Sequence, residues 1–218
     1  MPIRFLLAAL ASLMVFLSAL RPAEAAEFSI DGVRLTMSGT IYGRHEFETL
    51  SKLIRENPAV KIVVMKNFYG GRAGTAGFFN FTKFIRDNKL ATEVDGACVS
   101  ACAIAFMGGV QRSVSPKADP KKSFVAFHGL YIRGGKLVEE YEPTYVAALQ
   151  RYSGGRMPAA VAKRAYTMPK NGFLAFFDGR KAGGEISVIL CEDARKFSSG
   201  GCKGITDVDA HKVGVYTN

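Results

Sequence analysis

The sequence of 218 residues lacks several patterns that would assign it directly to a class. After residue 20 no stretch is long and apolar enough to span a bilayer, and there is no internal repeat or low-complexity segment. Neither the Walker pattern nor G-x-G-x-x-G is present, which argues against a nucleotide-binding protein. The four cysteines lack paired C-x-x-C spacing and have no histidine nearby, so no metal site is expected.

The first 25 residues have the features of an export signal. Met1–Arg4 is short and basic, Phe5–Leu20 is almost entirely apolar, and the small residues Ala23 and Ala25 follow Pro22. This order predicts a secretory signal peptide whose cleavage leaves residues 26–218 as a single periplasmic or secreted domain. The alternative is a retained N-terminal membrane anchor, because the apolar run approaches spanning length.

The chain is basic, with 29 Lys and Arg against 19 Asp and Glu. Arg4, Arg21 and Glu24 lie in the predicted signal, so the remainder keeps 27 basic against 18 acidic residues. Outside the cytoplasm nucleic acid is not an expected partner, and an anionic envelope surface is the remaining electrostatic counterpart. The basic residues are scattered rather than clustered, which favours general solubility and at most weak association with such a surface.

An even number of cysteines in an oxidising compartment predicts disulfides. Cys191 and Cys202 flank a polar, Gly-rich segment and are expected to close a loop near 191–202, whereas Cys98 and Cys102 are four residues apart. Spacing alone leaves all three pairings open. A reduced Cys98 or Cys102 acting as a nucleophile is a minor alternative, since it would need a thiol of depressed pKa.

Strand-like and helix-like segments alternate along the chain. This alternation predicts an α/β domain with crossover connections, in which a site lies beyond the carboxyl ends of the strands. Expected strands are residues 61–65, 90–94 and 123–127; expected helices are residues 45–57, 78–85, 100–107, 144–152 and 159–166; hairpins or short strands are expected at 29–42 and 131–141.

Three turns follow the expected strands and carry the candidate functional residues. Gly70-Gly71 can aim backbone amides at an anion or a carbonyl oxygen, although a tight turn without ligand explains it equally well. Ser100 lies where a strand enters a helix, so it is either an exposed hydroxyl or a helix N-cap. His128 ends a strand on the same side and could serve as the base for a serine, or be a satisfied core histidine. His45 is expected on a surface helix and His211 in a polar helical segment.

The joint order of these motifs resembles a known family. The stretches IVVMKNFYGGRAGTAG, DGACVSACAIAFMGGVQRSVSPKA and SFVAFHG are similar to the ClpP/crotonase superfamily, and most of all to exported ClpP-like proteins that carry C-x-S-A-C at the serine. LTMSGTI and ITDVDAHKVGVYT extend the likeness, which covers most of residues 35–130 and 205–217. The resemblance implies a ClpP/crotonase-like spiral of ββα units with a mostly parallel sheet and flanking helices.

The resemblance also implies roles for individual residues. Ser100 would be the nucleophile, His128 its general base, and the amides of Gly71 and Ala101 the oxyanion hole. The expected activity is that of a serine peptidase or related hydrolase acting on a peptide or protein, without a cofactor. Self-association as a homo-oligomer is expected by analogy.

Departures from the family pattern leave alternatives open. The turn reads F-Y-G-G, and the third triad member is not identifiable, with Asp178 as candidate and Asp193 as rival. A Ser-His dyad is therefore possible, as is a catalytically inactive ClpP-like protein that binds a peptide or an envelope component. A crotonase-type acyl-CoA enzyme is less expected, because CoA is not anticipated outside the cytoplasm.

Overall fold

The computed structural model of the chain describes residues 26–217 except 42, 71–74, 133 and 185. The predicted signal peptide and Gly71 therefore lie outside the described residues. Within the described part, no helix has the length and apolar character needed to cross a membrane.

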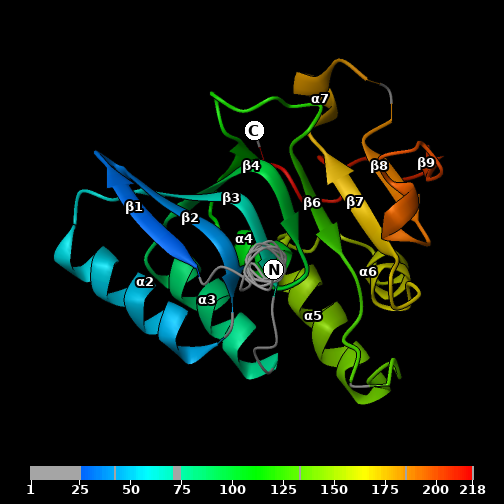
Figure 1. Cartoon of the computed structure of the whole chain (residues 1–218), viewed down its shortest axis with the longest axis horizontal. Helices are drawn as coiled ribbons and strands as arrows, with labels where there is room; N and C mark the ends of the chain where they lie inside the picture. The colour runs from blue at the N-terminus through cyan, green and yellow to red at the C-terminus, as the bar shows by residue number, and fades with distance from the viewer. Residues whose placement is uncertain (1–25, 42, 71–74, 133, 185, 218) are drawn as a thin grey trace, which may run out of the picture.

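One mixed sheet organises the domain (Figure 1). Its strand order is β1-β2-β3-β4-β6-β7-β8-β9, with β5 beside the first half of β4. Pairing is parallel from β2 to β6 and antiparallel on both flanks. The predicted α/β fold with a largely parallel sheet and flanking helices is confirmed. The strands are β1 Glu27–Asp31, β2 Arg34–Ile41, β3 Ile62–Gly70, β4 Ala91–Val99, β5 Arg112–Val114, β6 Phe124–Phe127, β7 Phe173–Phe177, β8 Val188–Cys191 and β9 Lys203–Ile205.

The helices lie largely along one side of this sheet, as Figure 1 shows. In α2, Leu50 and Ile54 are buried one turn apart, and Phe47 packs edge-on against Phe81 and Phe84 of α3 with ring centroids 5.4 and 5.7 Å apart. Apolar spacing in the sequence therefore marks the face that α2 packs against α3. The helices are α2 Arg44–Glu56, α3 Thr75–Asp87, α4 Ala101–Phe106, α5 Glu142–Tyr152, α6 Ala159–Tyr166 and α7 Gly179–Ala182, with 3-10 turns at Glu139–Tyr141 and Ala194–Lys196.

The opposite face of the first strands is polar. Along β2, Leu35 and Met37 are fully buried, whereas Arg34 and Thr36 alternate with them and remain partly exposed. This period of two places the apolar residues under the helices and the polar residues on a face that no described helix covers.

Two segments in the second half of the chain have less regular structure than expected. The hairpin expected at 131–141 is present in a short form: Tyr131 and Leu137 make an antiparallel bridge, the Val138 amide donates to the Leu130 carbonyl at 2.9 Å, and a 3-10 turn follows. The helical segment expected around His211 is a series of turns, and His211 is 5% exposed rather than on a polar surface. The contact between His211 and Asp178 joins residues far apart in the chain, and local pattern cannot reveal such a contact.

Candidate active site

The carboxyl ends of three parallel strands lie level with one another. Tyr69 on β3 is paired with Val99 on β4, and Val99 with Ala126 on β6. The residues that follow are therefore brought to one edge of the sheet, as expected from the strand-turn pattern. The amide of Ser100 continues the ladder by donating to the Ala126 carbonyl at 3.0 Å.

Ser100 has a backbone conformation that side-chain-bearing residues rarely adopt. Its φ of 64° and ψ of −118° mirror the extended region, which only glycine enters without strain. Ser100 occupies the N-cap position of α4, yet its side chain makes no capping hydrogen bond. The simple capping interpretation is therefore wrong. A strained strand-to-helix turn is also where the nucleophilic serine of some hydrolases lies, so Ser100 remains a candidate nucleophile.

Gly70, the last residue of β3, lies directly against the serine turn. A Cβ added to Gly70 would lie 2.4 Å from the Ala101 amide nitrogen and 2.8 Å from Ser100 Cβ, so only glycine fits there. Ala101 begins α4, and its amide therefore has no acceptor within the helix. Of the two amides expected in an oxyanion hole, Ala101 is thus adjacent to Ser100, while Gly71 lies outside the described residues.

His128 follows β6 and has a defined tautomer. Its Nδ1 is 2.7 Å from the Gly129 carbonyl oxygen. Because a carbonyl only accepts, Nδ1 carries the proton, and Nε2 keeps a lone pair that can accept one. Burial lowers the pKa of His128, and the bond to Gly129 opposes this only in part. The imidazole is therefore neutral at neutral pH, as a general base must be.

Ser100 and His128 line one cavity of about 260 Å³. The remainder of its wall is mostly aromatic. The F-Y-G-G turn suggests such a wall, but neither Phe68 nor Tyr69 lines this cavity, and which rings do depends on how α5 and α6 pack against the strand ends. The large side chains on the wall are Phe78, Phe79, Ile104, Leu130, Tyr131, Tyr141, Tyr145, Tyr166 and Lys170.

Asp178 does not meet His128. Phe177 is paired with Phe124 at the start of β6, whereas His128 follows the end of β6, so the two side chains lie roughly 15 Å apart along the strands. Asp178 is 1% exposed, and its Oδ1 lies 2.8 Å from Nε2 of His211. The expectation that Asp178 completes a triad is therefore replaced by a buried pair with His211 at the far end of the sheet.

The rival acid, Asp193, is committed elsewhere. It follows β8, which is two strands from β6, roughly 10 Å across the sheet. Its carboxylate binds the guanidinium of Arg195 at 2.7 Å, and the hydrogen bonds from Arg195 lower the pKa of Asp193 to about 2. Among the described residues, no carboxylate contacts the imidazole of His128.

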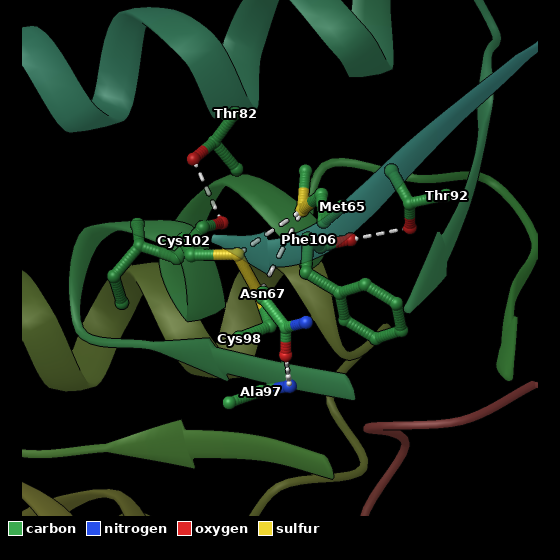
Figure 2. Close-up of a disulfide and its surroundings, with 9 residues drawn as sticks. Met65, Asn67, Thr82, Thr92, Ala97, Cys98, Cys102 and Phe106 are labelled. Atoms are coloured by element: carbon green, nitrogen blue, oxygen red, sulfur yellow. Dashed lines mark hydrogen bonds between the residues drawn. A yellow bond between two sulfur atoms is a disulfide. The ribbon is translucent and has the colours of Figure 1, made fainter. Parts of the chain in front are cut away.

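All four cysteines form disulfides, in one of the three pairings that the sequence leaves open. Cys98 is joined to Cys102, and Cys191 to Cys202, which leaves no free thiol and makes the cysteine-nucleophile alternative wrong. The first bridge spans the turn that contains Ser100 and is completely buried. Figure 2 shows Met65 of β3 beside it, with its sulfur 3.8 and 3.5 Å from the two bridge sulfurs.

A second, larger hollow lies away from these residues. It measures about 870 Å³, covers the polar face of β1 to β4, and contains neither Ser100 nor His128. Its charged side chains are balanced in sign, with Arg34, Lys66 and Lys117 against Glu27, Asp31 and Asp95. We therefore place the candidate active site in the smaller cavity. In the described part of the chain, no cluster of His, Cys, Asp and Glu could hold a metal ion.

Comparison with known proteins gives structural likenesses only. The chain matches no protein-family profile and no curated protein by sequence. Solved structures similar to it include a serine-to-alanine mutant of a membrane-bound stomatin-specific protease (TM-score 0.46, 10% identity, 84% of this chain and 75% of that one). Another is an enoyl-CoA hydratase/isomerase family member, with a TM-score of 0.45 and 12% sequence identity over 88% of this chain and 69% of that one. A third is a putative enoyl-CoA hydratase/isomerase from Acinetobacter baumannii, with a TM-score of 0.41 and 16% sequence identity over 75% of this chain and 71% of that one. Likenesses at this level carry no conclusion about activity.

Proposed function

We propose that the chain is an exported serine hydrolase of the ClpP/crotonase superfamily and that it acts as a peptidase. The observation that carries the proposal is the strained Ser100, whose uncommitted hydroxyl shares a cavity with a neutral His128. A strained residue with no structural use for its side chain is expected where chemistry requires that geometry. Two disulfides support a location outside the cytoplasm.

The reaction follows from the atoms available. Nε2 of His128 takes the proton of Ser100 as Oγ attacks the carbonyl carbon of the substrate, and the carbonyl oxygen becomes negative. The Ala101 amide stabilises this oxyanion, and the Gly71 amide is the second donor that the resemblance implies. His128 then gives its proton to the leaving amine, and water releases the acyl group by the same steps in reverse. The Gly129 carbonyl, which accepts from Nδ1, orients the ring in place of a carboxylate.

The absence of a carboxylate beside His128, within the described residues, has a kinetic consequence. A triad acid stabilises the imidazolium that forms in the transition state, and its removal costs up to about 10⁴-fold in rate in a serine protease. We therefore expect a Ser-His dyad with low turnover. The same feature motivates a second candidate function, a catalytically silent protein that holds a peptide in this cavity.

Labelling with a fluorophosphonate separates the two functions. The purified chain from residue 26 onward should form a covalent adduct at Ser100, and His128→Ala should slow its formation at least about a hundredfold. Ser100→Ala should abolish it. Ser113→Ala is a matched control, since Ser113 lies on β5 outside the cavity. Absence of an adduct on a chain whose circular dichroism and melting are normal would exclude the hydrolase and leave the binding protein.

The export proposal has its own test. Expression with the full N-terminus in a bacterium that exports proteins should yield a protein cleaved after Ala25 in the periplasm or medium. A product that retains residues 1–25 and sediments with membranes would instead identify an N-terminal anchor. Size-exclusion chromatography with light scattering on the same product tests the expected homo-oligomer.

A further inference from the structure

The polar groups on the described wall of the cavity that holds Ser100 and His128 are hydrogen-bond donors, and none of them is acidic. Apart from those two side chains, the polar side chains on its described wall are four tyrosines and Lys170. No described residue of the wall is acidic. The wall therefore offers hydrogen-bond donors and a positive charge to a ligand, while the carboxylates of Glu140 and Glu142 act on Tyr166 from outside the wall.

Tyr145 carries an unused donor. Its side chain is 9% exposed, and its hydroxyl forms no hydrogen bond to a described residue. The hydroxyls of Tyr131 and Tyr166, in contrast, donate to the carbonyls of Met168 and Val138. Burial raises the pKa of Tyr145, so its phenol stays protonated and remains a donor. An acceptor on a ligand can therefore take this donor without breaking a hydrogen bond to another described residue.

Lys170 brings a positive charge to the mouth of the same cavity. It lies in a turn closed by the Gly172 amide and the Pro169 carbonyl at 2.7 Å. A Cβ added to Gly135 would lie 3.0 Å from Lys170 Cδ, so the lysine stem rests against that glycine. Its ammonium group forms no ion pair with a carboxylate in the described part of the chain. Lys163 and Lys122, in contrast, do form such pairs.

We propose that this cavity selects substrates that carry an apolar or aromatic side chain together with a carboxylate next to the scissile bond, with Lys170 and Tyr145 as specificity-determining residues. The proposal rests on the proposed function, because it places the scissile bond at Ser100. The aromatic wall takes the side chain, and a volume of about 260 Å³ suits one residue rather than a longer segment. The carboxylate is either the free C-terminus of a peptide or an acidic side chain.

Binding to the Ser100→Ala chain tests selection without hydrolysis. Three probes are compared by calorimetry: acetyl-Phe-Ala with a free carboxylate, acetyl-Phe-Ala amide, and acetyl-Phe-Glu amide. The first or the third should bind about tenfold more tightly than the neutral amide, since a hydrogen bond to a charged group is worth that much. The first identifies a C-terminal carboxylate as the preferred source, and the third identifies an acidic side chain. The difference should shrink at high salt.

Variants of the same chain connect the preference to the two residues. Lys170→Met should abolish the advantage of the carboxylate, whereas Lys121→Met, which removes the same charge outside the cavity, should preserve it. Tyr145→Phe should weaken the carboxylate probe several-fold without lowering the melting temperature. Equal binding of all three probes, or equal effects of the two lysine variants, would overturn the inference.

The inference and the proposed function fail separately. If the fluorophosphonate never labels Ser100 but the carboxylate preference depends on Lys170, the cavity is a binding site and only the hydrolase is excluded. If Ser100 is labelled and peptides are cleaved with no preference for a carboxylate, the hydrolase stands and the proposed selectivity is wrong.

Discussion

Cys98 and Cys102 are bonded to each other across the turn that holds Ser100, with their Cα atoms 5.2 Å apart. Cys98 belongs to β4 and Cys102 to α4, so the bridge fixes the end of the strand relative to the first turn of the helix. Both residues are completely buried. A strained conformation persists only where its surroundings enforce it. We regard this bridge as part of what holds Ser100 in its left-handed conformation.

Removing that bridge should therefore affect the serine more than the fold as a whole. Cys98→Ala with Cys102→Ala should slow fluorophosphonate labelling of Ser100 about tenfold, because the turn can relax toward unstrained conformations. Cys191→Ala with Cys202→Ala removes the other bridge and serves as the control. Equal labelling rates in the two double variants would show that the first bridge does not position Ser100.

Replacing Ser100 itself should expose the stored strain. Ser100→Gly and Ser100→Ala both remove the hydroxyl, but only glycine adopts a φ of 64° with a ψ of −118° freely. The glycine variant should be more stable than the alanine variant by about 1 kcal/mol, or roughly 2–4 °C in melting temperature. Differential scanning calorimetry measures the difference, and a glycine variant no more stable than the alanine variant would contradict the strain.

The pH dependence of labelling should report on His128. Burial lowers the pKa of His128 below its usual value, and only the neutral ring can accept a proton. The rate should rise with pH, reach half its maximum below about pH 6.5, and stay level through pH 8. A midpoint well above 6.5 would indicate either a protonated ring stabilised by a nearby anion or a different base.

Asp178 should matter for stability and not for chemistry. Asp178→Asn leaves His211 without its buried carboxylate partner, which should cost about 3 kcal/mol of unfolding free energy, as for other broken buried pairs. Labelling of Ser100 below the melting temperature should be unchanged. A large fall in labelling rate without loss of stability would restore Asp178 as a catalytic acid.

The contact between Gly70 and the serine turn predicts a clash. Gly70→Ala would place a methyl group 2.4 Å from the Ala101 amide nitrogen, where backbone leaves no room. The turn would have to move away from Ser100, so labelling should fall at least tenfold. Gly184→Ala is a control for the change of residue, because its φ is not positive and the nearest atom to an added Cβ there, the Ile186 carbonyl oxygen, is 4.0 Å away. Unchanged labelling in Gly70→Ala would exclude a role for this turn beside the serine.

The sequence predicts the central strands and helices well, because their apolar spacing reflects which face is buried. It also predicts that Ser100 and His128 lie at one edge of the sheet, since parallel strands align their carboxyl ends. Asp178 could not be placed in the same way. FLAFF is uniformly buried, and nothing in it reveals that β7 runs antiparallel to β6 and carries Asp178 to the opposite end.

The cavity wall was equally inaccessible to sequence reasoning. Tyr145 and Tyr166 lie on helices that were expected, and their rings meet with centroids 4.9 Å apart. Which side of each helix faces the site depends on α5 packing against α6. The contact between Gly129 and the Tyr166 carbonyl, where an added Cβ would lie 2.0 Å away, depends on the same packing. Such contacts join residues far apart in the chain, and no local pattern encodes them.

The hydrogen bond from the Ser100 amide to the Ala126 carbonyl ties the heat stability of the site to that of the central sheet. It makes the serine the last rung of the ladder between β4 and β6, and β6 leads to His128 two residues later. The two side chains therefore cannot separate by the opening of a surface loop; they separate when the centre of the sheet comes apart. Loss of Ser100 labelling on heating should accordingly coincide with global unfolding and not precede it. Labelling can then be used to follow the unfolding of the sheet.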